Sequence, residues 1–412
     1  MPTARRIDSG FPLSHDTYNG LSAASDGCIY YVLCTESYEA GGRMFRYDSR
    51  TGEVHACADL TQACGESGAV PQSKSHVNFH EHEGKLYFAT HVGIYSIFEG
   101  RETMPIPPEG VAPYPGGHFL AHDLANGAIE DLGVAPHGEG ILAMTMDGPR
   151  QRAYAITWPY GHFLVCDTAA RTIRDLGRIS ELGEAGRGPT YRTLCRAIQV
   201  DPRDGSAYFS VSEGTIFRYP FDAPAYHAVQ GDDLRKDYFG LYDPASPGHM
   251  AYNWRQTVWH ARSECIYGVH GNSGYLFRFD PRGERVQLLQ RITSLPSQRC
   301  GMFDQFSYGY LGFTLGPDGN TIYYLTGGPL FDGGRRVAGR ASTARGEAKG
   351  EENLHLVTYH IPSEHYQDHG PVLFADGTRP SYVNSIAVGA DGVVYALARP
   401  GSGTSSDLIE IR

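Results

Sequence analysis

The sequence predicts an all-β fold: a single domain over residues 1–412, built as a seven-bladed β-propeller. Three observations indicate this fold. The chain contains 51 glycines and 25 prolines, and 12% of its residues are aromatic. Short segments rich in Val, Ile, Tyr and Phe alternate with Gly, Asp and Pro, as in strands joined by tight turns. One unit of three or four such strands recurs seven times, and repeats of this kind are typical of propeller blades.

Each unit opens with two strands joined by a turn, often Asp-Gly. The seven hairpins read SAASDGCIYYV, FHEHEGKLYFA, ILAMTMDGPRQRAYAIT, AIQVDPRDGSAYFS, QTVWHARSECIYGV, GFTLGPDGNTIYYL and SIAVGADGVVYAL. The last unit stops after its third strand, so we expect the segment 1–13 to add the missing outer strand and close the ring. Residues 327–352 are polar and rich in Gly and Arg. This composition predicts a flexible insertion in the sixth blade.

The composition also limits the kinds of partner that the protein is expected to bind. The net charge of −11 argues against nucleic-acid binding but permits a local basic pocket for an anionic ligand. No apolar run approaches the length of a membrane helix, and the N-terminus lacks the apolar core of a signal peptide. We expect no membrane association, a monomer or weak dimer, and either a mature secreted or periplasmic form or a cytoplasmic protein. None of the eight cysteines forms a CxxC pair, which disfavours a zinc ribbon.

Two positions in every blade open on the same face of a propeller. They are the start of the innermost strand and the loop after the second strand. At strand starts, where small or apolar residues are usual, this sequence places Tyr18, Asn19, His76, Arg196, Arg255, Tyr310 and Asn384. In the loops it places His91, Tyr160 and His270. We expect these side chains to converge on one central pocket.

Four histidines crowd the segment KSHVNFHEHEGKLYFATHVG. His76 and His91 fall at the two pocket-facing positions of the second blade. His80 and His82 fall toward the opposite end of the first strand, where we expect solvated or turn histidines. For His118 and His162, which lie beside third strands in GGHF and YGHF, a structural role is favoured.

This set of residues suits elimination chemistry on a uronic acid. The residues predicted to line the pocket include few carboxylates, whereas a glycosidase usually needs two, and no GxSxG elbow or P-loop occurs in the sequence. Guanidinium groups bind carboxylates through two parallel hydrogen bonds, and His and Tyr transfer protons. An arginine would neutralise the sugar carboxylate and so acidify the hydrogen on C5. A His or Tyr would remove that proton, and a second one would protonate the departing O4.

The KSH…YFATHVG blade, the TWPYGHF blade and the arginine-bearing blades resemble the seven-bladed propeller polysaccharide lyases. These include ulvan lyases and lyases that cleave L-rhamnose-α-1,4-D-glucuronate. The resemblance implies β-elimination with a His and a Tyr as acid and base and an arginine as neutraliser. Carried over, the histidine role falls on His76 or His91, the tyrosine role on Tyr160, and the neutraliser on Arg196 or Arg255. It implies an anionic oligo- or polysaccharide as substrate.

Two other functions share the same pocket. One is a propeller glycoside hydrolase acting on a terminal rhamnose–glucuronate linkage, and the other is a non-catalytic propeller that binds carbohydrate or protein. We expect no required cofactor. The alternative is a bound zinc or calcium ion on His76 and His91, with His270 and Cys195 as further donors. The His-x-His pairing of the metal-dependent propeller oligogalacturonate lyases is not found in the late blades.

Overall fold

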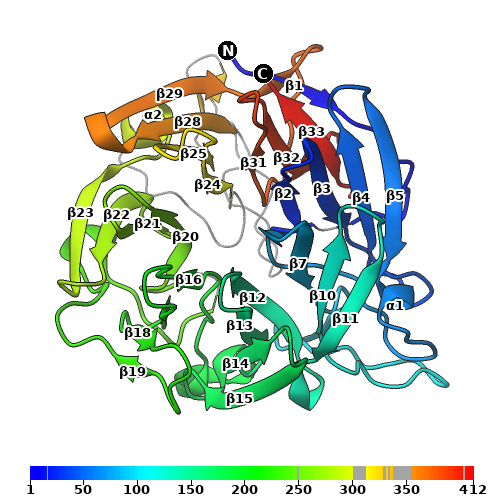
Figure 1. The fold of residues 1–412 in the computed structure, drawn as a ribbon. Coiled ribbons are helices and arrows are strands. Elements are labelled where there is room, and N and C mark those ends of the chain that lie inside the picture. Colours follow the sequence, from blue (N-terminus) through cyan, green and yellow to red (C-terminus); the bar gives the residue numbers. More distant parts are fainter. Residues whose placement is uncertain are drawn as a thin grey trace.

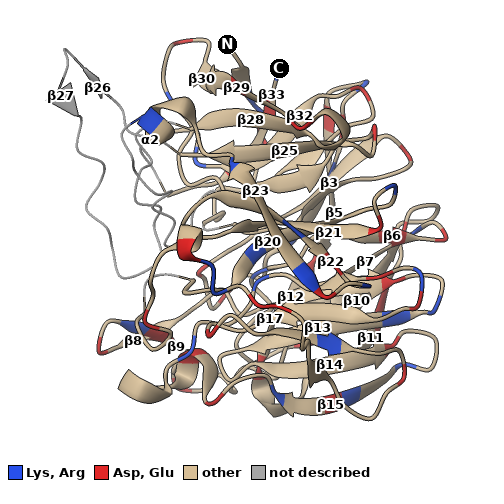
Figure 2. Ribbon diagram, turned by 90° about the vertical axis from the view of Figure 1, so that its left-hand side faces the viewer, with Lys and Arg blue, Asp and Glu red and all other residues tan. Residues whose placement is uncertain are grey.

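The computed structural model of the chain describes residues 1–15, 17–247, 250–299, 312–327, 331–332, 335–336, 354–401 and 404–412. Seven sheets surround a central axis (Figure 1). The predicted seven-bladed propeller is therefore confirmed. Figure 2 views the ring from the side, with the face turned toward the viewer in Figure 1 on its right.

Blades one to three are four-stranded sheets whose neighbouring strands run antiparallel. Blade one contains β2 (Leu21–Ala23), β3 (Cys28–Leu33), β4 (Arg43–Asp48) and β5 (Glu53–Asp59). Blade two contains β6 (His80–His82), β7 (Lys85–Ala89), β10 (His118–Asp123) and β11 (Ile129–Val134). Blade three contains β12 (Gly140–Asp147), β13 (Arg152–Trp158), β14 (His162–Asp167) and β15 (Thr172–Arg178).

Blades four to six repeat this order. Blade four contains β16 (Gln199–Val200), β17 (Ala207–Ser210), β18 (Ile216–Tyr219) and β19 (His227–Ala228). Blade five contains β20 (Trp254–His260), β21 (Cys265–His270), β22 (Tyr275–Asp280) and β23 (Arg285–Arg291). Blade six contains β24 (Phe313–Leu315), β25 (Thr321–Thr326), β28 (His355–His360) and β29 (His365–Pro371).

Blade seven joins the two ends of the chain. Its inner strands are β31 (Ala387–Val388), β32 (Val394–Ala398) and β33 (Asp407–Ile411), and the N-terminal β1 (Thr3–Arg6) pairs antiparallel with β33. This is the closure expected for the N-terminal segment. A fifth strand, β30 (Leu373–Phe374), pairs parallel with β1 and was not anticipated.

The remaining elements are short. Two strand pairs lie outside the blades: β8 (Ser96–Phe98) with β9 (Arg101–Thr103), and β26 (Phe331–Asp332) with β27 (Arg335–Arg336). The helices are α1 (Leu60–Ala63), α2 (Leu295–Arg299) and the 3-10 turns η1 (Pro136–Gly138), η2 (Gly183–Ala185), η3 (Gly188–Thr190), η4 (Asp237–Phe239) and η5 (Ile361–Ser363). No helix in the described ranges is long and apolar enough to cross a membrane. The predicted insertion 327–352 lies largely outside the described residues.

The Asp-Gly turns explain why the repeats fold alike. In blade one, Asp26 accepts the backbone N–H of Cys28 at 2.9 Å, and Gly27 adopts a φ of 83°. In blade seven, Asp391 accepts from Val393 at 3.1 Å, and Gly392 has a φ of 81°. Such turns favour glycine at the position with positive φ. The aspartate side chain accepts a hydrogen bond from the backbone N–H two residues later, which the chain reversal would otherwise leave without a partner.

The apolar core lies between neighbouring blades. One cluster joins Leu21, Ile29 and Phe45 of blade one to Leu397 and Leu408 of blade seven. Three further clusters link the other blades in the same way. Because each blade buries its faces only against its neighbours, the ring closes as a unit.

A histidine–aspartate pair recurs between the third and fourth strands. The pairs are His118–Asp131 in blade two at 2.9 Å, His162–Asp175 in blade three at 2.8 Å and His355–Asp368 in blade six at 2.8 Å. Each aspartate also accepts the N–H of the glycine two residues later. The pair thus fixes a strand bulge. This agrees with the structural role expected for His118 and His162.

Candidate functional site

A cavity of about 450 Å³ runs along the propeller axis. The innermost strands line it, among them β12, β16, β20 and β24 (Figure 1). Three of the predicted site residues reach it: Asn19, His76 and Arg196. Each stands just before the first strand of its blade, at the end of the cavity where the innermost strands begin. A cavity of this size fits a small ligand such as one or two sugar units.

Lys74 lies at the centre of the polar groups at this end. Its side chain is fully buried, and its backbone pairs with that of His91. The ammonium lies 4.5 Å from the ring centroid of Tyr18 and 4.9 Å from that of Tyr95. Within the described ranges it has no carboxylate partner; its polar contact is the Tyr95 hydroxyl at 3.5 Å. Two aromatic faces stabilise a cation, but burying it without a counter-ion remains costly.

Two histidines complete the cluster around Lys74. The ring of His76 stacks on Tyr18 at 4.0 Å between centroids and meets His91 edge-on at 4.7 Å. Burial lowers the pKa of His76 well below its ordinary value, and the nearby charges of His91, Lys74, Arg196 and Arg255 lower it further. His76 is therefore neutral at pH 7.

Glycine at position 140 makes room for His91. A Cβ atom at Gly140 would lie 2.2 Å from Nδ1 of His91, which no side chain tolerates. The other face of His91 lies against Trp158, 5.7 Å away between ring centroids. Burial also lowers the pKa of His91, and Lys74 and Arg196 reinforce this effect.

Two arginines flank the histidines. Arg196 donates from Nη1 to Oε1 of Glu184 at 2.6 Å and to the carbonyl of Leu194 at 2.7 Å. Arg255, at the start of β20, is 3% exposed and contacts the sulfur of Met250 at 3.1 Å. Both arginines lie close enough to depress the pKa of His76. The structure thus brings His76, His91, Arg196 and Arg255 together, as expected.

Tyr18 and Asn384 connect the cluster to blade seven. The hydroxyl of Tyr18 lies 3.3 Å from that of Tyr382, whose ring faces the guanidinium of Arg399 at 4.1 Å. Asn384 is fully buried and donates to the carbonyl of Thr17 at 2.9 Å. Asn384 therefore anchors the segment that carries Tyr18.

Two of the predicted site residues that the structure describes, Tyr160 and His270, do not join the cluster. Tyr160 is 37% exposed and packs under the guanidinium of Arg178, 4.8 Å from its ring centroid, so its placement in the pocket is wrong. His270 is fully buried, stacked on Phe239 at 4.2 Å, and both its ring nitrogens have partners in Ser273 and Ala251. His270 is not among the residues that line the cavity. Tyr310 lies outside the described residues.

His80 is placed differently from the expectation. It lines the cavity, because the cavity continues along β6. Its Nε2 lies 3.3 Å from the carbonyl of Met144, and burial lowers its pKa to about 4. His82 lies away from the cluster, 3.8 Å from Glu83, as expected.

The additional metal donors considered for His76 and His91 are engaged elsewhere. His270 uses both nitrogens, and the thiol of Cys195 contacts the carbonyl of Ala197 at 3.1 Å and the hydroxyl of Ser210 at 3.5 Å. Among the described residues, neither of these two side chains is placed as the third donor that a zinc site on the histidine pair would require.

Sequence reasoning missed Lys74 and Trp158. Lysines are normally solvated, so an isolated one in QSKSH gives no signal of burial. The clue available was its position two residues before His76, on the same side of an extended segment. Trp158 stands two residues before Tyr160, and it rather than Tyr160 contacts His91.

Comparisons with known proteins identify the fold. No family model matches the chain, and no curated protein matches it. Among solved structures, virginiamycin B lyase from Staphylococcus aureus superposes with a TM-score of 0.54 at 9% identity, over 100% of this chain and 98% of that one. A chain of the mitotic checkpoint complex gives a TM-score of 0.53 at 10% identity, over 99% and 90%.

A third similar structure is the extracellular domain of the putative hybrid two-component system BT3049 from B. thetaiotaomicron. Its TM-score is 0.53 at 13% identity, and the match covers 99% of this chain and 41% of that one. At these identities the likeness concerns the propeller fold alone.

Proposed function

We propose that the protein is a carbon–oxygen lyase that cleaves a uronic-acid-containing glycan by β-elimination at the central cluster. The observation that carries this proposal is Lys74, a fully buried cation without a described carboxylate partner, beside two histidines of lowered pKa. An anionic ligand that reached Lys74 would supply the missing counter-charge. The substrate class is ulvan-like chains or rhamnose–glucuronate linkages.

The residues divide into two roles. Lys74, Arg196 and Arg255 would bind the uronate carboxylate and stabilise the negative charge that develops on it after deprotonation. Neutral His76 would remove the proton from C5. The C5 electron pair would then form the C4–C5 double bond as the C4–O4 bond breaks.

A tyrosine completes the reaction by protonating the departing oxygen. Tyr18 takes the role first assigned to Tyr160, because Tyr18 stacks on His76 at 4.0 Å whereas Tyr160 faces outward. The hydroxyl of Tyr382, 3.3 Å from that of Tyr18, offers a route for its reprotonation. Among the compared structures, virginiamycin B lyase carries the name of a lyase on the same fold, which is compatible with the proposal.

The test is to incubate the purified protein with ulvan, gum arabic and rhamnose-capped glucuronate oligosaccharides. We expect products that carry the conjugated C4–C5 double bond, and their ultraviolet absorbance measures the reaction. If saturated sugars are released without that absorbance, the protein is a glycoside hydrolase and not a lyase. Saturable binding of uronate oligosaccharides without any product would favour the non-catalytic, carbohydrate-binding function.

A further inference from the structure

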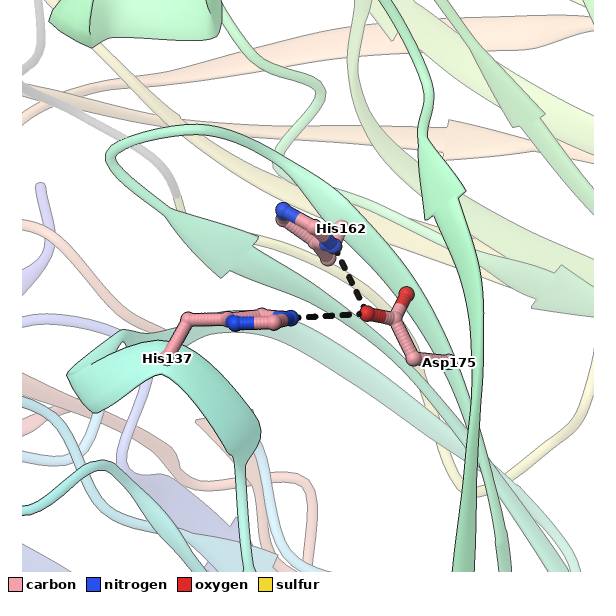
Figure 3. Close-up of side chains that lie close together, drawn as sticks. All are labelled: His137, His162 and Asp175. Atoms are coloured by element: carbon pink, nitrogen blue, oxygen red, sulfur yellow. Dashed lines mark hydrogen bonds and ion pairs between the residues drawn. The ribbon is translucent and has the colours of Figure 1, made fainter.

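We infer that the surface of blade three holds a divalent transition-metal ion, of which zinc is the best fit, bound by His137, His162 and Asp175. The Nε2 atom of His137 lies 3.0 Å from Oδ2 of Asp175, and Nδ1 of His162 lies 2.8 Å from the same oxygen. Figure 3 shows the two rings converging on this carboxylate. The three donor atoms lie within 4.8 Å of one another. This site is separate from the central cluster and independent of its proposed function.

The distances between the donor atoms are close to those around an ion with four tetrahedral ligands. Ligand atoms about 2.0–2.2 Å from zinc lie about 3.3 Å from one another. The observed separations of 2.8 and 3.0 Å therefore need only small side-chain movements to admit an ion. Oδ1 of Asp175 accepts the backbone N–H of Gly177 at 2.8 Å, which fixes the carboxylate and leaves Oδ2 facing the histidines.

The recurring histidine–aspartate pairs show what is special to blade three. In blade two, the second nitrogen of His118 is held by the carboxylate of Glu66 at 2.7 Å. In blade three, a second histidine approaches the aspartate instead. His137 reaches it from η1 with a backbone φ of 66°, a left-handed conformation that is unusual for histidine. Its side chain is 53% exposed, so an ion has access from solvent.

A buried carboxylate stands behind the site. Glu139 is 2% exposed, and within the described part of the chain its Oε1 has no hydrogen-bond partner; it lies 3.7 Å from Nε2 of His162. Its other oxygen accepts from the hydroxyl of Thr157 at 2.5 Å and the N–H of Tyr160 at 3.3 Å. Metal-binding histidines commonly donate their second N–H to such a carboxylate. With Nε2–H directed to Glu139, the lone pair of Nδ1 is free for the ion.

The donor set selects the kind of metal. Two imidazoles and one carboxylate suit Zn²⁺, and also Co²⁺, Ni²⁺ and Cu²⁺, whereas Ca²⁺ and Mg²⁺ prefer sites built of oxygen. Three protein ligands leave the fourth position to water. The ion would tie η1 of the loop before β12 to strands β14 and β15.

The experiment uses the untagged chain of residues 1–412, stripped of metal with a chelator that is then removed. Zn²⁺ is titrated in competition with a chromophoric chelator, and Co²⁺ is titrated separately. We expect one equivalent of Zn²⁺ to bind, and Co²⁺ to give the visible absorption of a tetrahedral site. His137→Ala should remove this equivalent, and Glu139→Gln should weaken it about 10–100-fold.

His55→Ala is the matched control, because the side chain of His55 is 50% exposed and lies on β5, away from blade three. It should bind Zn²⁺ like the unaltered protein. The inference is overturned if the unaltered protein binds no equivalent of Zn²⁺, or if His137→Ala, folded by circular dichroism, retains it. Equal loss in His137→Ala and His55→Ala would also overturn it, since binding would then reflect scattered surface histidines.

Discussion

Tyr18 and His76 stack ring on ring, with 4.0 Å between centroids and 18° between planes, although one stands before blade one and the other before blade two. The contact places a phenol against the neutral imidazole of His76, which lines the axial cavity. The ammonium of Lys74 lies 4.5 Å from the centroid of the same Tyr18 ring. A phenol, a neutral imidazole and a buried cation thus lie in contact around one ring.

Removing the proposed acid or base should slow turnover strongly while leaving the fold intact. Tyr18→Phe keeps the stacked ring and deletes only the hydroxyl, and His76→Gln deletes the titratable ring. Since general acid–base help contributes roughly 10²–10⁴-fold, we expect kcat for uronate elimination to fall by about that factor in each variant. The initial rate at which ultraviolet absorbance increases, measured at saturating substrate, gives kcat. His82→Gln is the control and should keep full activity; a Tyr18→Phe variant with unaltered kcat would exclude Tyr18 as the acid.

Replacing the buried Lys74 should weaken the binding of uronate ligands without lowering the stability of the fold. In Lys74→Met the long apolar side chain fills the same space without a charge, and exchanging a buried charge for an apolar residue is often neutral or stabilising by about 1–4 kcal/mol. We therefore expect an unchanged or higher midpoint of urea unfolding, together with loss of binding to a glucuronate oligosaccharide by calorimetry. Retained affinity in Lys74→Met would show that the ammonium does not meet the carboxylate.

Stability should fall in acid through His80. The pKa of His80 is lowered to about 4 by burial, so the unfolded chain, with an ordinary histidine pKa near 6.5, takes up a proton first. The contribution of neutral His80 is complete above about pH 6.5 and is lost as the pH falls toward 4. His76 and His91 shift in the same direction. The His80 part is isolated by His80→Gln, which still reaches the carbonyl of Met144.

The measurement is the free energy of unfolding in urea at about pH 7, 5.5 and 4.5 for both proteins. The loss between the first and last pH should be smaller in His80→Gln than in the unaltered protein. Parallel losses in the two proteins would mean that His80 is solvated in the folded state.

The fold could be predicted because its determinants are local and repeated. An Asp-Gly turn between two short apolar strands specifies a hairpin from a few neighbouring residues, and seven copies specify the ring. The position of His76 and Arg196 followed from the same periodicity, since each precedes the innermost strand of its blade. The parallel addition of β30 to β1 could not be predicted, because it depends on where two distant segments meet.

The errors in the site have a common physical origin in loop conformation. Tyr160 and Trp158 both stand near the end of β13, and the repeat pattern does not say which one turns inward. The N–H of Tyr160 bonds to Glu139, and the loop with η2 packs against Pro159 and Tyr160, where a Cβ at Gly183 would lie 2.5 Å from the carbonyl of Pro159. These contacts between distant segments set the rotation of the strand end. They direct Trp158 to His91 and Tyr160 to solvent.

The contact between Gly140 and His91 gives a test of the cluster that does not depend on any substrate. In Gly140→Ala the new methyl group would lie 2.2 Å from Nδ1 of His91, and the ring has little room to retreat because Trp158 and His76 stand against it. Overpacking of this kind typically costs about 1–3 kcal/mol. We expect a lower urea midpoint and, because His91 shifts against His76, reduced affinity for glucuronate oligosaccharides. Gly401→Ala is the control, since a Cβ there meets no atom within 4 Å. If both variants unfold like the unaltered protein, His91 does not occupy the position that the cluster requires.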